Sequence, residues 1–144
     1  MKYDFVSSER SALLSLQRAT HATLHRIATE LVDLDMTASE INALGNLADG
    51  QSRTVSQVAA LIGARPTTMT SVLDRLDKRG LITRVARAGD RRSVLIELTD
   101  SGRATAAAIR RTFADLESRT LGDLPPEAVV GFYTVLDALI EKNR

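Results

Sequence analysis

The chain has 144 residues, a net charge of +1 and an apolar content of 44%, which is typical of one folded domain with a packed core. It contains no cysteine, which excludes a disulfide scaffold, a thiolate metal site and a cysteine-based redox switch. The first ten residues are polar and no apolar run reaches membrane-spanning length. We therefore expect a cytoplasmic protein with no membrane partner.

Charge is distributed unevenly along the chain. Between Arg53 and Arg92, nine basic side chains oppose three acidic ones, a net charge of +6. The remaining residues carry ten basic and fifteen acidic side chains, a net charge of −5. A basic middle segment is expected when one lobe binds a polyanion, whereas an isolated charged segment is usually a solvated surface. Supporting geometry has to decide between the two interpretations.

A long helix is predicted from Ser7 or Ser8 to about Asp35, because the positions of one helical face recur every three or four residues. These positions are Leu13, Leu16, Thr20, Leu24, Ile27, Leu31 and Leu34. A helix of this length in so short a chain cannot bury its stripe against one small core. We expect it to pack against long partner helices, including those of another subunit.

A second helix is predicted to begin at Thr37, where Thr37 and Glu40 match a capping box. In that motif each of the two side chains satisfies an unpaired amide at the helix start. The helix carries Ile41, Leu44 and Leu47 inward and stops at the turn of residues 49–50.

Two further short helices follow a short extended segment at residues 52–55. The first begins at either Thr54 or Ser56 and ends at Gly63. Pro66 opens the next helix, since proline is favoured at the first helical position, and Gly80 lies just past its end. The residues predicted to form the buried stripe of this helix are Met69, Val72, Leu73 and Leu76. Two short helices joined by a tight glycine-containing turn form a helix-turn-helix.

The segments 82–87 and 93–98 alternate apolar and polar residues and are predicted to be strands. Residues 88–92 between them form the tip of a hairpin. A helix-turn-helix followed by such a hairpin is a winged helix.

The C-terminal region is predicted to form two helices, one alanine-rich from Arg103 to about Thr120 and one that begins after residues 124–127. The last helix has an apolar face wider than one core requires, which indicates an interface. We expect one domain, 1–144, that is mainly α with a small β-hairpin wing. It combines a winged helix-turn-helix DNA-binding lobe, 37–99, with a helical dimerisation lobe, 1–36 and 100–144.

The start of the helix after Pro66 is rich in short hydroxyl side chains, which can reach base edges and phosphates in the major groove. The candidate DNA-binding residues here are Arg65, Thr67, Thr68, Thr70 and Ser71, with Arg75 one turn later. Arg75 is better placed to bind a phosphate. An isolated helix start of this composition would be only a cap, and the helix-turn-helix context favours DNA.

The hairpin tip carries Asp90, Arg91 and Arg92. An arginine at the end of a rigid hairpin can enter the minor groove, whose negative potential is strongest where the groove is narrow. Asp90 is suitably spaced to hold the rotamer of such an arginine. Outside this context the same tripeptide is usually a solvated turn.

The order of elements and the run LDRLDKRGLITR at residues 73–84, followed by Asp90-Arg91-Arg92 and Leu98-Thr99, resembles the MarR family of bacterial and archaeal transcription regulators. The resemblance covers essentially the whole chain. It implies a homodimer joined through its first and last two helices, with the helix after Pro66 in the major groove and the wing in the minor groove. It further implies that Arg92 is the wing-tip arginine, Asp90 its buttress and Arg75 a contact to the DNA backbone. The chain departs from the family pattern at Arg65, where serine is frequent.

The resemblance also implies an effector, because many members release DNA when a small phenolic or other aromatic acid binds between the two lobes. His21 and His25 lie one helical turn apart near the expected position of that pocket. They are candidate effector-pocket residues, ordinary histidines, or half of a metal site that lacks an evident third ligand. We predict neither a metal nor another cofactor.

The sequence therefore predicts a sequence-specific regulator that binds double-stranded DNA at a pseudo-palindromic operator and acts as a repressor released by an effector. Motifs for phosphate-binding loops or nucleophilic catalysis are absent from the sequence, so an enzyme is not expected. The alternative is a winged helix that serves only as a protein–protein interaction module, for which Arg91 and Arg92 would be dispensable.

Overall fold

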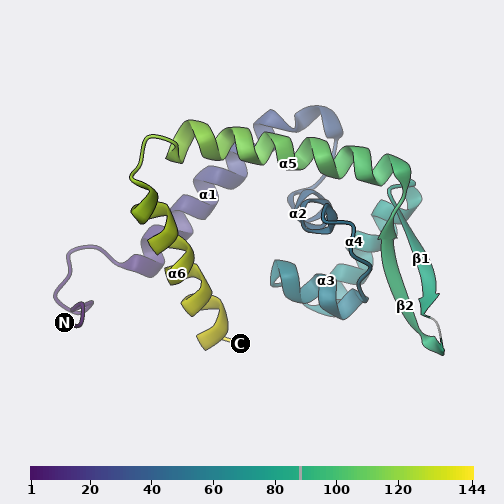
Figure 1. Cartoon of the computed structure of the whole chain (residues 1–144), viewed down its shortest axis with the longest axis horizontal. Coiled ribbons are helices and arrows are strands. Elements are labelled where there is room, and N and C mark those ends of the chain that lie inside the picture. The colour runs from purple at the N-terminus through teal and green to yellow at the C-terminus, as the bar shows by residue number, and fades with distance from the viewer. Residues whose placement is uncertain (88) are drawn as a thin grey trace. The chain divides into compact units, whose positions relative to one another are not determined.

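The computed structural model describes residues 1–87 and 89–144, with the side chains of Arg87, Asp90, Arg91 and Arg92 excepted. In chain order the elements are α1 (Ala12–Glu30), η1 (Val32–Leu34, a 3-10 turn), α2 (Ala38–Leu47), α3 (Val55–Ile62), α4 (Pro66–Lys78), β1 (Ile82–Arg87), β2 (Asp90–Leu98), α5 (Asp100–Leu121) and α6 (Pro126–Lys142) (Figure 1). The chain forms two compact units, Met1–Thr112 and Phe113–Arg144, with the boundary inside α5. The predicted mainly helical fold with a small hairpin is confirmed.

The core of the first unit lies among α2, α3, α4, the hairpin and the start of α5. Its largest fully buried side chains are Leu44, Leu47, Val58, Met69, Val72, Leu73, Leu76, Ile82, Ile96 and Ile109. Aliphatic side chains dominate this list, as the low aromatic content of 3% requires. The helix-turn-helix is therefore held by close packing of small apolar faces.

Helix α1 is shorter than the sequence predicted. It begins after Ser11, whose hydroxyl accepts a hydrogen bond from the Leu14 amide, and not at Ser7 or Ser8. The segment before it is held in turns, because the Asp4 carboxylate accepts hydrogen bonds from the amides of Val6 and Ser7. Such local bonds compete with helix formation. At the other end, η1 and a left-handed Asp35 separate α1 from α2.

The apolar stripe of α1 remains open within its own unit. All nineteen residues of α1 are at least partly exposed, including Leu13 at 55% and Leu24 at 44%. A solvent-facing stripe of this kind on a long helix is typical of a surface that another chain covers.

Thr37 caps α2 as predicted, but the capping box is incomplete. The Thr37 hydroxyl accepts a hydrogen bond from the Glu40 amide at 3.2 Å. The Glu40 carboxylate does not turn back to the Thr37 amide in this described segment, as the motif would require; it accepts hydrogen bonds from the Thr37 hydroxyl and from Arg75 of α4. A tertiary ion pair has replaced the local bond.

The helix-turn-helix follows the sequence closely. Thr54, and not Ser56, is the N-cap of α3, and it forms a complete capping box with Gln57. Gly63 ends α3 in the left-handed conformation with φ of 69°, which glycine adopts without steric cost. Pro66 occupies the first turn of α4, and Gly80 follows its last turn with φ of 70°.

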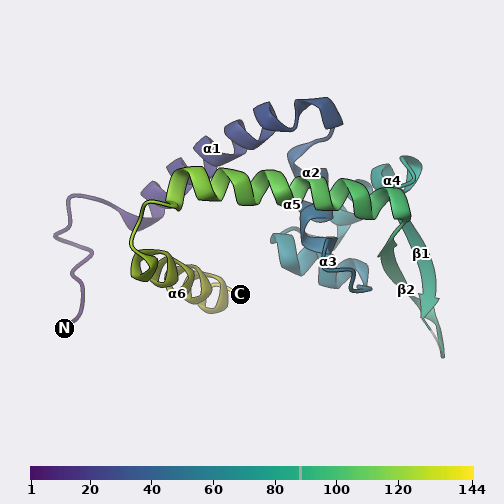
Figure 2. The same cartoon turned by 45° about the horizontal axis from the view of Figure 1, so that its top comes forward.

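The wing is a two-stranded antiparallel sheet that leaves the helical core at the N-terminal end of α5 (Figure 2). Its register pairs Ile82 with Leu98 and Ala86 with Val94, with a shift between Ala86 and Arg87. Strand β2 begins at Asp90, three residues earlier than predicted, so the backbone pairing extends nearer to the tip. The predicted extended piece is also present, since Arg53 and Ile96 exchange two backbone hydrogen bonds of 3.2 and 2.6 Å.

Helix α5 starts at Asp100, directly behind the hairpin. The Thr99 hydroxyl accepts a hydrogen bond from the Gly102 amide and donates one to the Gly80 carbonyl. The Thr99 amide bonds the Leu81 carbonyl at 3.1 Å. These contacts fix the first turn of α5 against the end of α4.

The second unit contains the end of α5 and the whole of α6. Every residue of α6 is at least partly exposed within the chain. Its exposed large apolar side chains are Val130, Phe132, Tyr133, Val135 and Ile140. The predicted wide apolar face is therefore present and uncovered in the single chain. In the described part of the chain, none of the helices has the length and apolarity needed to cross a membrane.

Candidate nucleic-acid interface

Helix α4 has one buried face and one polar face. Met69, Val72, Leu73 and Leu76 are each 0–2% exposed and anchor the helix to the core. The predicted DNA-contacting residues of α4 and its N-cap all lie on the exposed side: Arg65, Thr67, Thr68, Thr70, Ser71 and Arg75. The structure thus brings these six predicted residues together on the exposed side of one helix, over nearly three turns.

Arg65 occupies the N-cap position of α4 with extended backbone angles of −75° and 146°. A guanidinium carries only donors, so it cannot accept a hydrogen bond from the amides of the first turn as serine would. Its positive charge also lies at the positive end of the helix dipole. Local helix stability therefore does not explain an arginine at this position.

The hydroxyl side chains of α4 differ in whether they already form hydrogen bonds within the helix. Thr70 donates its hydroxyl hydrogen to the Pro66 carbonyl at 3.0 Å, which leaves its methyl group and its oxygen lone pairs for an external contact. Ser71 accepts a hydrogen bond from Arg75 at 3.2 Å. Thr67 and Thr68 are exposed in the first turn. The helix therefore presents donors, acceptors and methyl groups to a partner.

Arg75 is held by a carboxylate from another helix. Its Nε donates to Oε1 of Glu40 at 3.0 Å, although 46% of the Arg75 side chain remains exposed. Arg79, one turn later, donates to the carbonyls of Leu34 and Asp35 at 2.8 and 2.7 Å. Helix α4 is thus tied through two arginines to the end of η1 and the first turn of α2.

The two carboxylates on the outer side of α4 are paired within the lobe. Arg84 of β1 donates to Asp74 at 2.5 Å and to Asp77 at 2.6 Å. Exposed ion pairs of this kind stabilise the fold by about 1 kcal/mol or less. Their larger effect is electrostatic, because negative charge that would repel a polyanion next to the recognition helix is neutralised.

The predicted wing-tip contacts involve Asp90, Arg91 and Arg92, whose side chains lie outside the described residues. The backbone pairing of Arg87 with Asp90 places the three residues at the outer end of β2. Gly89 precedes them with φ of 81°, a conformation that favours glycine and allows a short connection.

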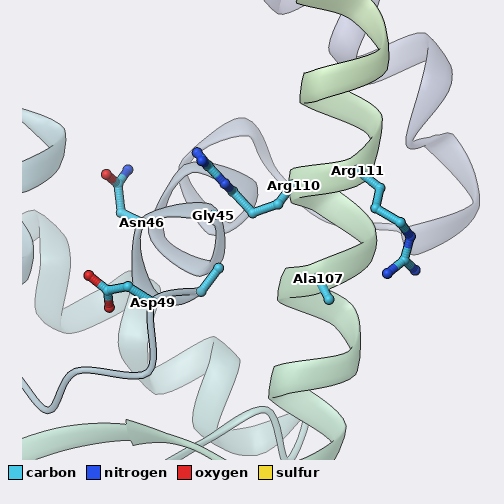
Figure 3. A pocket seen from close by; sticks show the side chains of 7 residues that line it. Gly45, Asn46, Asp49, Ala107, Arg110 and Arg111 are labelled. Atoms are coloured by element: carbon cyan, nitrogen blue, oxygen red, sulfur yellow. The ribbon is translucent and has the colours of Figure 1, made fainter.

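A pocket of about 590 Å³ opens in the first unit between the end of α2 and the middle of α5 (Figure 3). It is lined by Gly45, Asn46, Ala48, Asp49, Ala107, Arg110 and Arg111. In Figure 3, Arg110 extends from α5 toward α2, while Arg111 is directed to the opposite side of α5. A guanidinium group stays charged at physiological pH, so Arg110 places positive charge on the α5 side of the pocket.

The acidic residue of the pocket is already neutralised. Asp49 receives two hydrogen bonds from Arg53, at 2.9 and 2.5 Å, and one from the Gln51 amide at 3.0 Å. The Arg53 bonds, followed by the amide bond, lower the pKa of Asp49 from 3.8 to about 2. The net local field of the pocket therefore favours an anionic ligand.

His21 and His25 lie exposed on α1, whereas the pocket residues come from α2 and α5. Within the described residues, no three histidine, cysteine or acidic side chains are grouped closely enough to hold a metal ion.

Sequence reasoning missed Glu40, Arg110 and Arg111 as site residues. Glu40 matched a capping motif, which explained its position without any long-range partner. The two arginines lie in an alanine-rich helix with no local signal of a cavity. Adjacent arginines on a predicted helix were the available hint, but the opposing wall is contributed by residues some sixty positions earlier.

The MarR family model matches residues 34–93, which cover α2 to the start of β2. The HTH-type transcriptional regulator YfiV of Bacillus subtilis (strain 168) is 30% identical over 138 residues, covering 94% of this chain and 86% of that protein. The DNA complex of S. aureus MepR has a TM-score of 0.81 at 22% identity and covers 94% of this chain and all of that one. NadR in complex with 4-hydroxyphenylacetate has a TM-score of 0.82 at 20% identity, covering 97% and 98%.

The hairpin behind a helix-turn-helix defines the molecule as a winged-helix protein, with a polar recognition helix exposed on one side. The chain belongs to the MarR family of transcriptional regulators.

Proposed function

We propose that the protein is a homodimeric regulator that binds double-stranded DNA at a pseudo-palindromic operator and represses transcription. The observation that carries this proposal is the exposed polar face of α4, with Arg65, the hydroxyl side chains and Arg75 on a helix anchored by four buried residues. Such a helix fits the major groove, where hydroxyl groups and methyl groups contact base edges. Because MarR regulators belong to bacteria and archaea, whose DNA lies in the cytoplasm, we propose that the protein acts there.

The dimer follows from the uncovered apolar side chains of α1 and α6. Two copies related by a twofold axis present two recognition helices, which read half-sites about 34–36 Å apart, one turn of DNA. We propose residues 37–99 as the DNA-binding lobe of each copy and the flanking segments 1–36 and 100–144 as the dimerisation lobe. MepR, whose fold this chain shares, has been solved on DNA.

Selection of bound sequences from random DNA tests the function. We expect enrichment of an inverted repeat, with an affinity that falls steeply as salt rises because phosphate contacts release counterions. The absence of any enriched sequence would favour the alternative, a winged helix that binds only other proteins.

Arg92→Ala tests the proposed minor-groove contact of the wing. We expect operator affinity to fall roughly tenfold at constant salt, while the dimer and its melting temperature stay unchanged. Arg26→Ala, which removes an exposed arginine of α1 and so changes net charge equally, is the control. Equal binding by the Arg92 variant and the wild type would refute the contact.

We further propose that a small aromatic acid is the effector and that it binds the pocket between α2 and α5. NadR, with the same fold, was solved with 4-hydroxyphenylacetate, an aromatic carboxylate. In this chain Arg110 extends into the pocket from α5, and the carboxylate of Asp49 is paired with Arg53. An anion bound next to α2 would act on the helix that carries Glu40, the partner of Arg75.

Calorimetry with a panel of aromatic acids, followed by operator release, tests this site. Arg110→Gln should weaken binding of an active acid roughly tenfold, because a charge-assisted hydrogen bond is lost. A His21→Gln/His25→Gln variant tests the histidines predicted from the sequence. If only the histidine variant weakens binding of the acid, the effector site lies at α1 and not in the pocket between α2 and α5.

A further inference from the structure

Among the described residues, Glu40 is the charged side chain that the fold buries, with 4% of its surface exposed. Its Oε1 accepts hydrogen bonds from Arg75 Nε at 3.0 Å and from the Thr37 hydroxyl at 3.1 Å. Its Oε2 lies 3.8 Å from the nearer terminal nitrogen of Arg79. A buried carboxylate is costly unless it is paired, so its partners are held firmly in place.

The contact to Glu40 fixes the direction of the Arg75 guanidinium. Glu40 binds the Nε edge, and Ser71 accepts from one terminal nitrogen at 3.2 Å. Because the guanidinium is planar and its donors form a rigid fork, fixing the Nε edge also fixes the direction of the terminal edge. That side chain is 46% exposed on the polar side of α4. Arg75 is therefore preorganised: Nε binds Glu40, one terminal nitrogen binds Ser71, and the partly exposed side chain keeps further N–H donors for an anion.

The Glu40 carboxylate also lies beside Arg79, which connects α4 to the end of η1. Arg79 donates to the carbonyls of Leu34 and Asp35, which end η1 immediately before α2. Asp35 has φ of 50°, a backbone conformation that few non-glycine residues adopt. Glu40 thus lies where α2, α4 and the end of η1 are joined by polar contacts.

We propose that Glu40 is a positioning residue for DNA binding, which acts by holding Arg75 in the orientation that contacts a phosphate. The inference rests on the proposed function, since it requires α4 to bind DNA. It makes a prediction opposite to general electrostatics. Neutralising a carboxylate in a DNA-binding lobe ordinarily raises affinity for a polyanion, whereas loss of a positioning contact lowers it.

A double-mutant cycle with Glu40→Gln, Arg75→Gln and the combined variant tests this role on the selected operator. Glu40→Gln should lower affinity roughly three- to tenfold when Arg75 is present and have no effect when Arg75 is already glutamine. Arg75→Gln should also reduce the slope of log affinity against log salt by about one. Thermal unfolding of each variant separates loss of fold from loss of contact.

Glu97→Gln is the matched control, because Glu97 lies in β2 of the same unit and its carboxylate accepts from the Ser52 hydroxyl rather than from an arginine. We expect its affinity to equal or exceed that of the wild type. Equal losses from Glu40→Gln in both Arg75 backgrounds, or a gain in affinity, would overturn the positioning role. A wild-type protein that selects no DNA would instead overturn the proposed function itself.

Nitrogen–proton NMR of arginine Nε groups gives a second readout that needs no substitution at Glu40. The Arg75 signal, assigned with Arg75→Lys, should be protected from solvent exchange in the free protein and stay protected in the operator complex. Loss of protection on DNA binding would mean that the hydrogen bond from Arg75 Nε to Glu40 breaks in the complex, which contradicts positioning.

Discussion

Gly102 lies in the first turn of α5, where the backbone of Leu81 approaches it closely. A Cβ at this position would lie 1.8 Å from the Leu81 carbonyl oxygen, far inside contact distance. The approach has a cause, since that same oxygen accepts the hydrogen bond of the Thr99 amide. Glycine is therefore required here by close packing of two backbone segments and not by its freedom in φ.

Gly102→Ala should destabilise the protein by about 1–3 kcal/mol or more, because the clash with the Leu81 backbone forces α5 away and stretches the Thr99 bond. Urea unfolding measures the change. Gly45→Ala is the control, since its Cβ would make an ordinary contact of 3.5 Å with Ile109 and alanine favours a helix. Equal stability of the two variants would show that the backbone of Leu81 can move away from residue 102 without a loss of stability.

At the scale of elements, ion pairs add polar contacts at the surface between segments that also share the apolar core. Arg84 joins the wing to α4 through Asp74 and Asp77. Arg53 lies in the extended piece that pairs with β2, and its side chain reaches back to Asp49 after α2. These pairs set the directions of the wing and of the α2 end, whereas burial of aliphatic side chains supplies most of the stability.

The Asp49–Arg53 pair predicts a defined pH dependence. The pKa of Asp49 is lowered from 3.8 to about 2 in the folded protein, so the folded state favours the ionised carboxylate. The stability from the pair is complete above pH 3.8 and is lost as the pH falls through about 2. Because 43% of the Asp49 side chain is exposed, we expect a contribution of about 1 kcal/mol or less.

Urea unfolding of wild type and Asp49→Asn between neutral and acid pH measures this contribution. The difference in free energy of unfolding should be constant above pH 5 or so and shrink below about pH 4. Arg53→Gln should lose most of this pH dependence, and the bond from the Gln51 amide should keep the remainder. A difference that does not change with pH would show that the pair adds nothing through ionisation.

At the scale of the whole molecule, the apolar side chains that the single chain leaves open are the main unexplained feature of the fold. On α6, Val130 is 65% exposed, Tyr133 58% and Ile140 57%. On α1, Leu14 is 69% exposed. Association of two copies would remove this surface from water, and it would also set the distance between two recognition helices.

Truncation after Gly131 should abolish dimerisation, because it removes Phe132, Val135 and Ile140 together with the rest of α6. Sedimentation should then show a monomer at concentrations where the wild type is a dimer. Phe132→Asp keeps the helix complete and should weaken the dimer in the same direction, since 47% of this side chain is exposed in the single chain. A dimer that survives truncation would place the interface elsewhere.

The sequence by itself determined the local features of the protein. The spacing of Met69, Val72, Leu73 and Leu76 predicted the buried face of α4 and therefore its polar face. The capping residues narrowed the start of α3 to Thr54 or Ser56, of which the structure has Thr54, and the left-handed turns followed from Gly63 and Gly80. These predictions succeeded because periodicity and capping depend on residues a few positions apart.

Only the tertiary structure decided the partners. Glu40 finds Arg75 thirty-five positions away, Gly102 meets Leu81, and the wall of the pocket opposite α2 comes from α5. A helical pattern records which side of a helix is buried, but it does not record which element covers that side. Packing in three dimensions therefore brought the Glu40 carboxylate to Arg75 of α4. It also placed Arg110 opposite the end of α2 (Figure 3).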